Sequence, residues 1–173
     1  MENQMEKIEI NKTMHLSEHI TLGEVTKSRH AEIYNIPSHA AIENLKRVCA
    51  WLEELRRRYN LRYVLRSVSP PNSGGEIDTE EPIIINSGYR SPELNKKVGG
   101  SPTSNHLTGC AVDIRVAGIE QALRYAVILM DYADETRQDY DEILIEKNRY
   151  GAIWLHFAVR PKDNRRKTMF LQV

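Results

Sequence analysis

Residues 104–113 read SNHLTGCAVD, and an apolar alternation continues from there through Ile114 and Val116. The front of this stretch is polar and rich in turn-forming residues, whereas the alternation that follows is typical of a strand. The sequence therefore predicts a loop carrying His106 that leads into a strand carrying Asp113. A carboxylate inside a buried strand is unfavourable unless a cation or several hydrogen-bond donors lie close to it. Asp113 consequently needs a partner from elsewhere in the chain.

Another histidine, His156, lies in the middle of residues 153–159, IWLHFAV, which form a β-prone run. An isolated histidine in an apolar strand is more often hydrogen-bonded within the core than bound to a metal. Side-chain alternation along the strand separates the face of His156 from the face expected in the core. The His156 face holds Trp154 and Ala158, and the expected core face holds Leu155, Phe157 and Val159.

Together, His106, Asp113 and His156 offer two imidazole nitrogens and one carboxylate. Such a set can hold a zinc ion with three protein ligands and leave one coordination position open for chemistry. The spacing between His106 and Asp113 is a weak motif by itself, because the distant third ligand has to be brought near by the fold. The zinc site is therefore a prediction about the fold: these three side chains must converge.

Length and composition fit one compact domain, with 173 residues of which 40% are hydrophobic and 28% are charged. The 24 basic and 24 acidic side chains give a formal net charge of zero. Neither nucleic acid nor an anionic membrane surface is therefore expected as a partner. Residues 1–11 lack the apolar core of a signal peptide, and no membrane span is visible. We expect cytoplasmic synthesis, with the final location undecided.

Local patterns predict helices towards the front of the chain and strands behind them. Thr21–Glu24 fits a capping box, and apolar residues recur every three or four positions from Ser38 to about Tyr59. The other expected elements are a loop at 67–81, a strand at 83–85, a helix over 119–133, and strands at 141–146, 152–159 and 167–173. This order favours an α+β fold in which an antiparallel sheet carries the site and helices cover its other face.

The two cysteines, Cys49 and Cys110, form no closely spaced pair, so a disulfide scaffold is not expected. Cys110 lies between Gly109 and Ala111, where any small residue can fill the strand. A thiol nucleophile at Cys110 is the alternative to that packing role, and the sequence disfavours it.

Several segments resemble the M15 family of zinc peptidases, which cleave D-amino-acid bonds in peptidoglycan. The pattern S-x-H-x-x-G-x-A-x-D is matched at every fixed position over residues 104–113. Similarity to the small, single-domain branch found in phages and prophages extends over roughly residues 15–170, including 16–24, 87–101, 156–160 and 164–166. The resemblance implies a hedgehog/DD-peptidase-like domain at residues 15–173, after an N-terminal extension at residues 1–14. It also implies that the three predicted ligands hold zinc.

The resemblance further suggests roles on the substrate side of the site for Arg90, Ser101 and Ser104. The Arg90 guanidinium can grip a substrate carboxylate or stabilise the developing oxyanion, and a surface salt bridge is the alternative. Ser101 and Ser104 are candidates for substrate contact or for hydrogen bonds to the zinc ligands. Both serines are equally compatible with ordinary turns.

The general base is the point at which this chain departs from many M15 enzymes. Those enzymes place an acidic residue or a histidine two or three positions before the last zinc ligand, where this chain has Trp154 and Ile153. Neither side chain transfers a proton. Glu146 is the substitute if its strand pairs with the last ligand strand, although the register can also turn it into solvent as a structural carboxylate. Asp141 and Glu142 are lesser candidates for the base, and we expect them rather to be strand-edge charges.

Three functions are compatible with these patterns. The leading hypothesis is a zinc metallopeptidase of the D,D-carboxypeptidase or endopeptidase type, acting on peptidoglycan stem peptides through activated water. The alternatives are a binding module that keeps zinc and the groove without turnover, and a structural role in which zinc only stabilises the fold. Since peptidoglycan lies outside the membrane, an enzyme of this kind would reach the cell wall after release or by another export route. The sequence decides neither the bond cleaved nor the oligomeric state.

Overall fold

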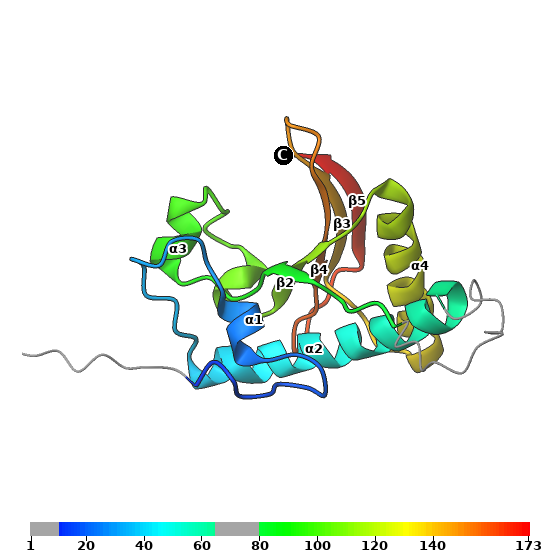
Figure 1. Cartoon of the computed structure of the whole chain (residues 1–173), viewed down its shortest axis with the longest axis horizontal. Coiled ribbons are helices and arrows are strands. Elements are labelled where there is room, and N and C mark those ends of the chain that lie inside the picture. The colour runs from blue at the N-terminus through cyan, green and yellow to red at the C-terminus, as the bar shows by residue number, and fades with distance from the viewer. Residues whose placement is uncertain (1–10, 65–79) are drawn as a thin grey trace, which may run out of the picture.

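The computed structural model describes residues 11–64 and 80–173, which form a five-stranded sheet with helices packed against it (Figure 1). The helical elements are α1 (Leu22–Thr26), α2 (His39–Tyr59), the π-helical turn η1 (Asn60–Val64), α3 (Pro92–Lys97), the 3-10 turn η2 (Asn105–Thr108) and α4 (Ile119–Thr136). The strands are β1 (Ile85–Ser87), β2 (Ala111–Arg115), β3 (Glu142–Lys147), β4 (Ile153–Ala158) and β5 (Lys167–Gln172). The predicted α+β class is confirmed.

The strands lie in the order β1-β2-β4-β3-β5. Three neighbouring pairs are antiparallel, as expected, but β5 runs parallel to β3. The expectation of a wholly antiparallel sheet is therefore wrong for this pair. The chain reverses direction after β4, so β5 is antiparallel to β4. Because β3 lies between these two strands and is itself antiparallel to β4, β5 has to run parallel to it.

Both predicted helix starts near the front of the chain are confirmed. The Thr21 side chain accepts from the backbone N–H of Glu24, and the Glu24 carboxylate accepts in return from the backbone N–H of Thr21. Ser38 caps α2 by accepting from the N–H of Ala41. Each cap satisfies backbone donors that have no partner within the helix. These contacts explain why α1 and α2 begin where the sequence predicts.

The sheet has one apolar face and one polar face. Cross-strand pairing places the large apolar side chains of β2, β3 and β4 together on one face, where they join the buried core with α2 and α4. Those side chains are Val112, Ile114, Ile143, Ile145, Leu155 and Phe157. Figure 1 shows α4 on one side of these strands and α3 on the other. The expected core face of β4 is confirmed, and the opposite face is free to carry polar chemistry.

Three predictions concern segments that the structure treats differently or leaves out. The strand expected at residues 83–85 begins only at Ile85, and Ile83 is buried just before it. The expected loop at 67–81 lies outside the described residues as far as residue 79, as do residues 1–10 of the proposed extension. Over the part of the chain that is described, no helix has the length and apolar character needed to cross a bilayer.

Candidate metal centre

The 3-10 turn η2 positions His106. Ser104 begins the turn by accepting from the N–H of His106, and Gly109 ends it with a φ of 73°. Gly109 is required here because this left-handed conformation is unfavourable for residues with a Cβ. A Cβ at this position would also lie 2.4 Å from the carbonyl oxygen of Ala41. The turn therefore packs directly onto α2 and fixes where His106 enters the core.

The imidazole of His106 is only 2% exposed, and its Nδ1 donates to the carbonyl oxygen of Gly88 at 2.6 Å. This hydrogen bond places the proton on Nδ1 and leaves the Nε2 lone pair free. Burial lowers the pKa of His106 below its usual value, even though Asp113 acts in the opposite direction. The neutral ring therefore presents an electron pair at Nε2.

Asp113 and His156 lie directly opposite each other on the antiparallel strands β2 and β4. They are 8% and 7% exposed, and His156 Nδ1 lies 2.9 Å from Asp113 Oδ1. Burial alone would lower the pKa of His156, but its hydrogen bonds to two carboxylates raise it above the usual value. Burial also opposes ionisation of Asp113, yet the neighbouring imidazoles lower its pKa. The cross-strand pair thus keeps this buried carboxylate ionised.

The three predicted ligands converge. One donor atom from each of His106, Asp113 and His156 lies within 4.8 Å of the others, and no other such group of His, Cys, Asp or Glu occurs among the described residues. His106 Nε2 lies 3.3 Å from Asp113 Oδ1, so that a lone pair faces a carboxylate oxygen. Two electron-pair donors facing one another suit a cation between them. Two nitrogens and one oxygen at this spacing are a donor set that fits zinc, whose bonds to such atoms are about 2.0–2.2 Å long.

Glu142 supports the centre from behind His156. Its Oε2 lies 3.3 Å from His156 Nε2, so the imidazole has one nitrogen on the ligand side and the other on a carboxylate. This arrangement orients a ligating histidine and fixes which nitrogen faces the metal. The Glu142 side chain is only 14% exposed and Asp141 is fully buried. The expectation that these two are strand-edge charges is wrong, because the chain beyond β4 folds over them.

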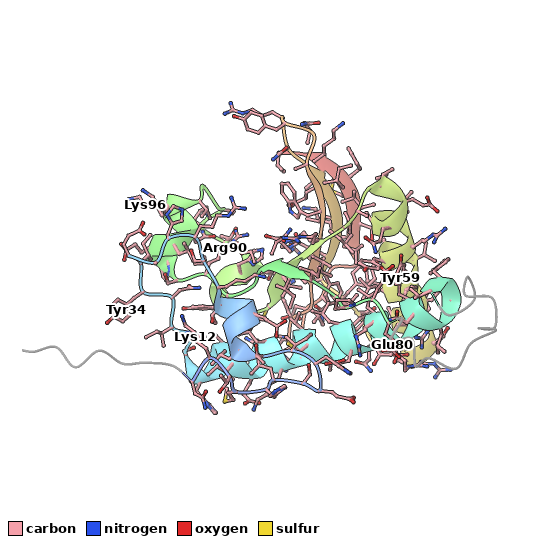
Figure 2. All side chains as sticks on the ribbon, viewed as in Figure 1. Lys12, Tyr34, Tyr59, Glu80, Arg90 and Lys96 are labelled. Carbon is pink, nitrogen blue, oxygen red and sulfur yellow. The ribbon has the colours of Figure 1, made fainter. Side chains whose placement is uncertain are left out.

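Arg90 lies against the ligand carboxylate. Its Nη2 donates to Asp113 Oδ2 at 2.6 Å and its Nε donates to Ser87 Oγ at 3.0 Å. Figure 2 shows Arg90 between α3 and the strands of the sheet. The alternative of a surface salt bridge does not describe this contact, since the partner is buried. Arg90 thus holds one oxygen of Asp113 while the other faces the imidazoles.

Cross-strand register brings Glu146 to the polar face. Glu146 pairs with Trp154, and Leu144 pairs with His156, so all four side chains share one face. Burial raises the pKa of Glu146 above its usual value, while His156 and Trp154 act to lower it. Glu146 therefore lies beside the position at which M15 relatives are expected to carry their base. The solvent-facing register that the sequence also allowed is not the one observed.

A cleft of about 620 Å³ opens beside the cluster. Both Asp113 and Arg90 line it, so the candidate metal centre is accessible from the cleft. The remaining lining residues are Lys27, Ser28, Arg29, His30, Asn86, Ser87, Leu94, Val98, Arg115 and Trp154. Ser101 and Ser104 are not among them. Ser101 accepts from the N–H of Thr103 within its turn, and Ser104 caps η2, so the structure gives both serines turn roles.

Neither cysteine has the properties of a nucleophile. Cys49 and Cys110 are both free and buried. Burial raises the pKa of the Cys110 thiol above its usual value and raises that of Cys49 to about 12. A thiol that stays protonated is a poor nucleophile. The packing role expected for Cys110 agrees with its burial directly before β2.

Sequence reasoning missed three features of this site: the partner of His156 at Glu142, the carbonyl of Gly88, and the basic lining of the cleft. Glu142 is four residues from Glu146 on the same strand, so the alternation that brings one to the polar face also brings the other. For Gly88, the sequence offered only the glycine itself as a hint of a close backbone contact. A Cβ there would lie 2.3 Å from the carbonyl oxygen of Val25, so only glycine fits between α1 and the ligand turn.

Part of the chain is similar to a known protein family. A family model described as Peptidase M15 matches residues 76–140, a segment that contains Arg90, His106 and Asp113. His156 and Glu146 lie beyond its end and are brought to the same place by the fold. No curated protein matches the chain. The match confirms the similarity to M15 peptidases and indicates a metallopeptidase.

Proposed function

We propose that this chain, which carries an M15 peptidase segment, is a zinc metallopeptidase that hydrolyses bonds involving D-amino acids in peptidoglycan stem peptides. One observation carries the proposal: His106 and Asp113 from the matched segment converge with His156 from outside it, next to an open cleft. Family similarity supplies the peptidoglycan substrate, which the geometry alone does not specify. Action on the cell wall would follow release from the cell, as in a phage or prophage lysis system, or export by another route.

In the proposed reaction, a zinc ion and the side chains around it would have different tasks. A bound zinc ion would polarise the scissile carbonyl and bring the pKa of water near neutrality. Glu146 takes a proton from the attacking water and delivers it to the leaving amine. A pKa raised by burial suits this exchange, because the carboxylate must first accept the proton and then release it. Glu142 keeps the proton on Nε2 of His156 and so holds the ring in a single orientation.

Arg90 completes the site. Two of its nitrogens are engaged by Ser87 and Asp113, whereas Nη1 has no protein partner among residues 11–64 and 80–173. A guanidinium nitrogen at the wall of the cleft can donate to the oxyanion that forms when the peptide carbonyl is attacked. Arg90 therefore fixes the orientation of the Asp113 carboxylate and stabilises negative charge on the substrate.

Mass spectrometry of muropeptides, after incubation with zinc-loaded protein, tests the proposal and identifies the bond. We expect products that differ from the substrate by hydrolysis at a D-amino acid. The His156→Ala variant should lose both zinc and activity. Glu146→Gln should keep its zinc and lower kcat by about 10²- to 10⁴-fold, the usual contribution of a general base. Full hydrolysis by His156→Ala would contradict the metal-dependent mechanism.

A second candidate is a zinc-containing module that binds stem peptides without turnover or serves only a structural role. Trp154 favours it, because an aromatic residue stands where M15 enzymes are expected to carry a proton-transferring group. Equilibrium binding of stem peptides to the zinc-loaded chain, with no product released over the same period, would establish this alternative. Absence of product from wild type and Glu146→Gln alike, with zinc bound to both, would also favour it.

A further inference from the structure

We propose that Lys27, Arg29 and Arg115 bind a carboxylate of the substrate within one or two residues of the scissile bond. This inference rests on the proposed function and specifies which peptides the cleft prefers. It assigns specificity to three residues outside the metal centre and its immediate supports.

The residues that line the cleft are mostly basic where they are charged. Its lining includes Lys27, Arg29, Arg90 and Arg115, but Asp113 is the one carboxylate among the lining residues. Asp113 is already occupied by Arg90 at 2.6 Å and by the two imidazoles. The cleft therefore has an excess of positive charge although the whole chain is formally neutral. Like charges that line one concave surface focus their field and attract an anion.

The cations that line the cleft beyond Arg90 have few protein partners among the described residues. Within residues 11–64 and 80–173, Lys27 and Arg29 make no ion pair, and Arg115 makes only a long hydrogen bond of 3.4 Å to Asn86 Oδ1. Elsewhere the arginines are often paired twice. Arg58 binds Glu54 and Glu135, and Arg166 binds Asp134 and Asp139. The cations around the cleft thus keep their hydrogen-bonding capacity for a ligand.

Strand geometry gives the distance from the reaction centre. Arg115 follows Asp113 by two positions on β2 and therefore points to the same face of the sheet. Two residues of a strand span about 7 Å. One peptide residue spans about 3.5 Å when extended, so a group one or two residues from the scissile bond comes within reach of Arg115. Trp154 pairs with Arg115 across the strands and lines the same cleft, so an apolar ring lies beside this cation.

The segment that carries Lys27 and Arg29 is anchored beside the metal side of the molecule. Lys27 and Arg29 follow α1 directly, and Asn35 ties this segment to the metal side of the molecule. The Asn35 amide donates to the carbonyl oxygens of Thr26 at 2.9 Å and Tyr89 at 3.0 Å. A wall that is already positioned loses little conformational freedom when a ligand binds. Because Lys27, Arg29 and Arg115 line one cleft, a carboxylate bound there is exposed to the positive charge of all three.

Matched peptides test the inference on the zinc-loaded full chain. One pair of stem peptides ends in D-alanine or in D-alaninamide, and a second pair has its neighbouring acidic side chain free or amidated. We expect kcat/KM to favour the free acid of at least one pair by about 10- to 100-fold, as for a hydrogen bond to a charged group. The pair that shows this preference identifies whether the terminal or the side-chain carboxylate is bound. Equal rates for both members of both pairs would overturn the inference while leaving the proposed peptidase intact.

Charge-removing variants localise the effect. Arg115→Gln and the double variant Lys27→Gln/Arg29→Gln should raise KM for the free acid, leave kcat and the rate on the amide nearly unchanged, and so reduce the preference. Arg137→Gln removes an exposed arginine at the end of α4, away from the cleft, and should behave as wild type. Equal losses on acid and amide would refute a carboxylate-binding role.

Binding measurements separate this inference from the proposed function. Isothermal titration of the same peptides into zinc-loaded Glu146→Gln requires no turnover. Tighter binding of the free acid, reduced by Arg115→Gln, supports the carboxylate site even if wild type hydrolyses nothing. Equal affinities for acid and amide count against the site whether or not hydrolysis occurs.

Discussion

Asp113 and Asp141 are both buried carboxylates, yet the protein satisfies them in different ways. Asp141, just before β3, is fully buried and is neutralised by two arginines. Arg160 lies at 2.8 Å and Arg165 at 2.6 Å, while Asn105 donates to the same carboxylate at 2.7 Å. Every one of these partners is a permanent donor, so the charge of Asp141 is fully met by the protein.

Asp113 has one permanent donor, Arg90, on one oxygen. Its other oxygen faces His106 and His156, and the neutral His106 ring offers it a lone pair rather than a proton. On the His106 side the chain therefore supplies no proton to this oxygen, and a metal cation there would satisfy both electron pairs. The contrast shows that burial alone does not identify a metal ligand. The protonation state of the neighbouring side chains distinguishes a ligand from a structural carboxylate.

The Asp113→Asn variant tests the ligand half of this contrast most directly. We expect it to lose bound zinc and to lower stem-peptide hydrolysis by about 10³-fold or more, since changes behind the ligands already cost about 10- to 100-fold. Zinc per chain after dialysis and muropeptide turnover measure the two effects. A variant that kept a full equivalent of zinc would place Asp113 in the same class as Asp141.

Glu142 contacts both regions, because Oε2 faces His156 and Oε1 pairs with Arg165 at 2.9 Å. Replacing it with alanine removes the acceptor behind the imidazole of His156, a proposed zinc ligand, so zinc affinity should fall by about 10- to 100-fold. Competition with a chromophoric chelator measures this change. The control Glu135→Ala removes an exposed partner of Arg58, and its zinc affinity should equal that of wild type. Unaltered zinc affinity in Glu142→Ala would exclude Glu142 as a positioning residue.

Asp141→Asn should affect folding rather than metal binding. The free energy of unfolding should fall by about 1–3 kcal/mol, because an uncharged amide leaves buried hydrogen-bond donors poorly matched. Urea denaturation measures the change. Zinc should still raise the Tm of this variant, as for any ligand that binds the folded state, whereas it should not raise that of Asp113→Asn. If zinc failed to raise the Tm of either variant, Asp141 would also be needed for zinc binding, and the two carboxylates would not differ in role.

The smallest expected effect is on the pH dependence of stability. Burial opposes ionisation of Asp141, but Arg165 and Asn105 lower its pKa below the ordinary value of 3.8. The ionised form therefore stabilises the fold above about pH 4, and this contribution is lost as the pH falls through the lowered pKa. Unfolding curves from pH 6 to pH 2 should show a steeper acid loss for wild type than for Asp141→Asn, and parallel curves would contradict this.

Local sequence patterns predicted much of the fold and the three side chains that converge at the candidate site. The caps at Thr21 and Ser38, the apolar stripe of α2 and the three ligands depend on residues close together in the chain or on a family pattern. The parallel β5 and the contact of Glu142 with His156 depend instead on which residues face each other across strands. A shift of one residue would reverse every face, and the register depends on how two strands pair rather than on either strand alone. The cleft cations escaped prediction for the same reason, since they come from segments far apart in sequence.

The contacts of Gly88 determine how much of the chain would be needed to transfer the candidate metal site to another protein. Its carbonyl oxygen holds the proton of His106 Nδ1, while its missing Cβ lets Val25 of α1 approach the same peptide. The N–H of Tyr89 closes the contact by donating to the carbonyl oxygen of Val25 at 2.7 Å. Grafting residues 76–140 alone would therefore transfer the candidate ligands His106 and Asp113. It would leave out α1, which fixes the position of His106 through Gly88, and β4, which carries His156. The smallest transplantable unit has to begin before α1 and extend through β4.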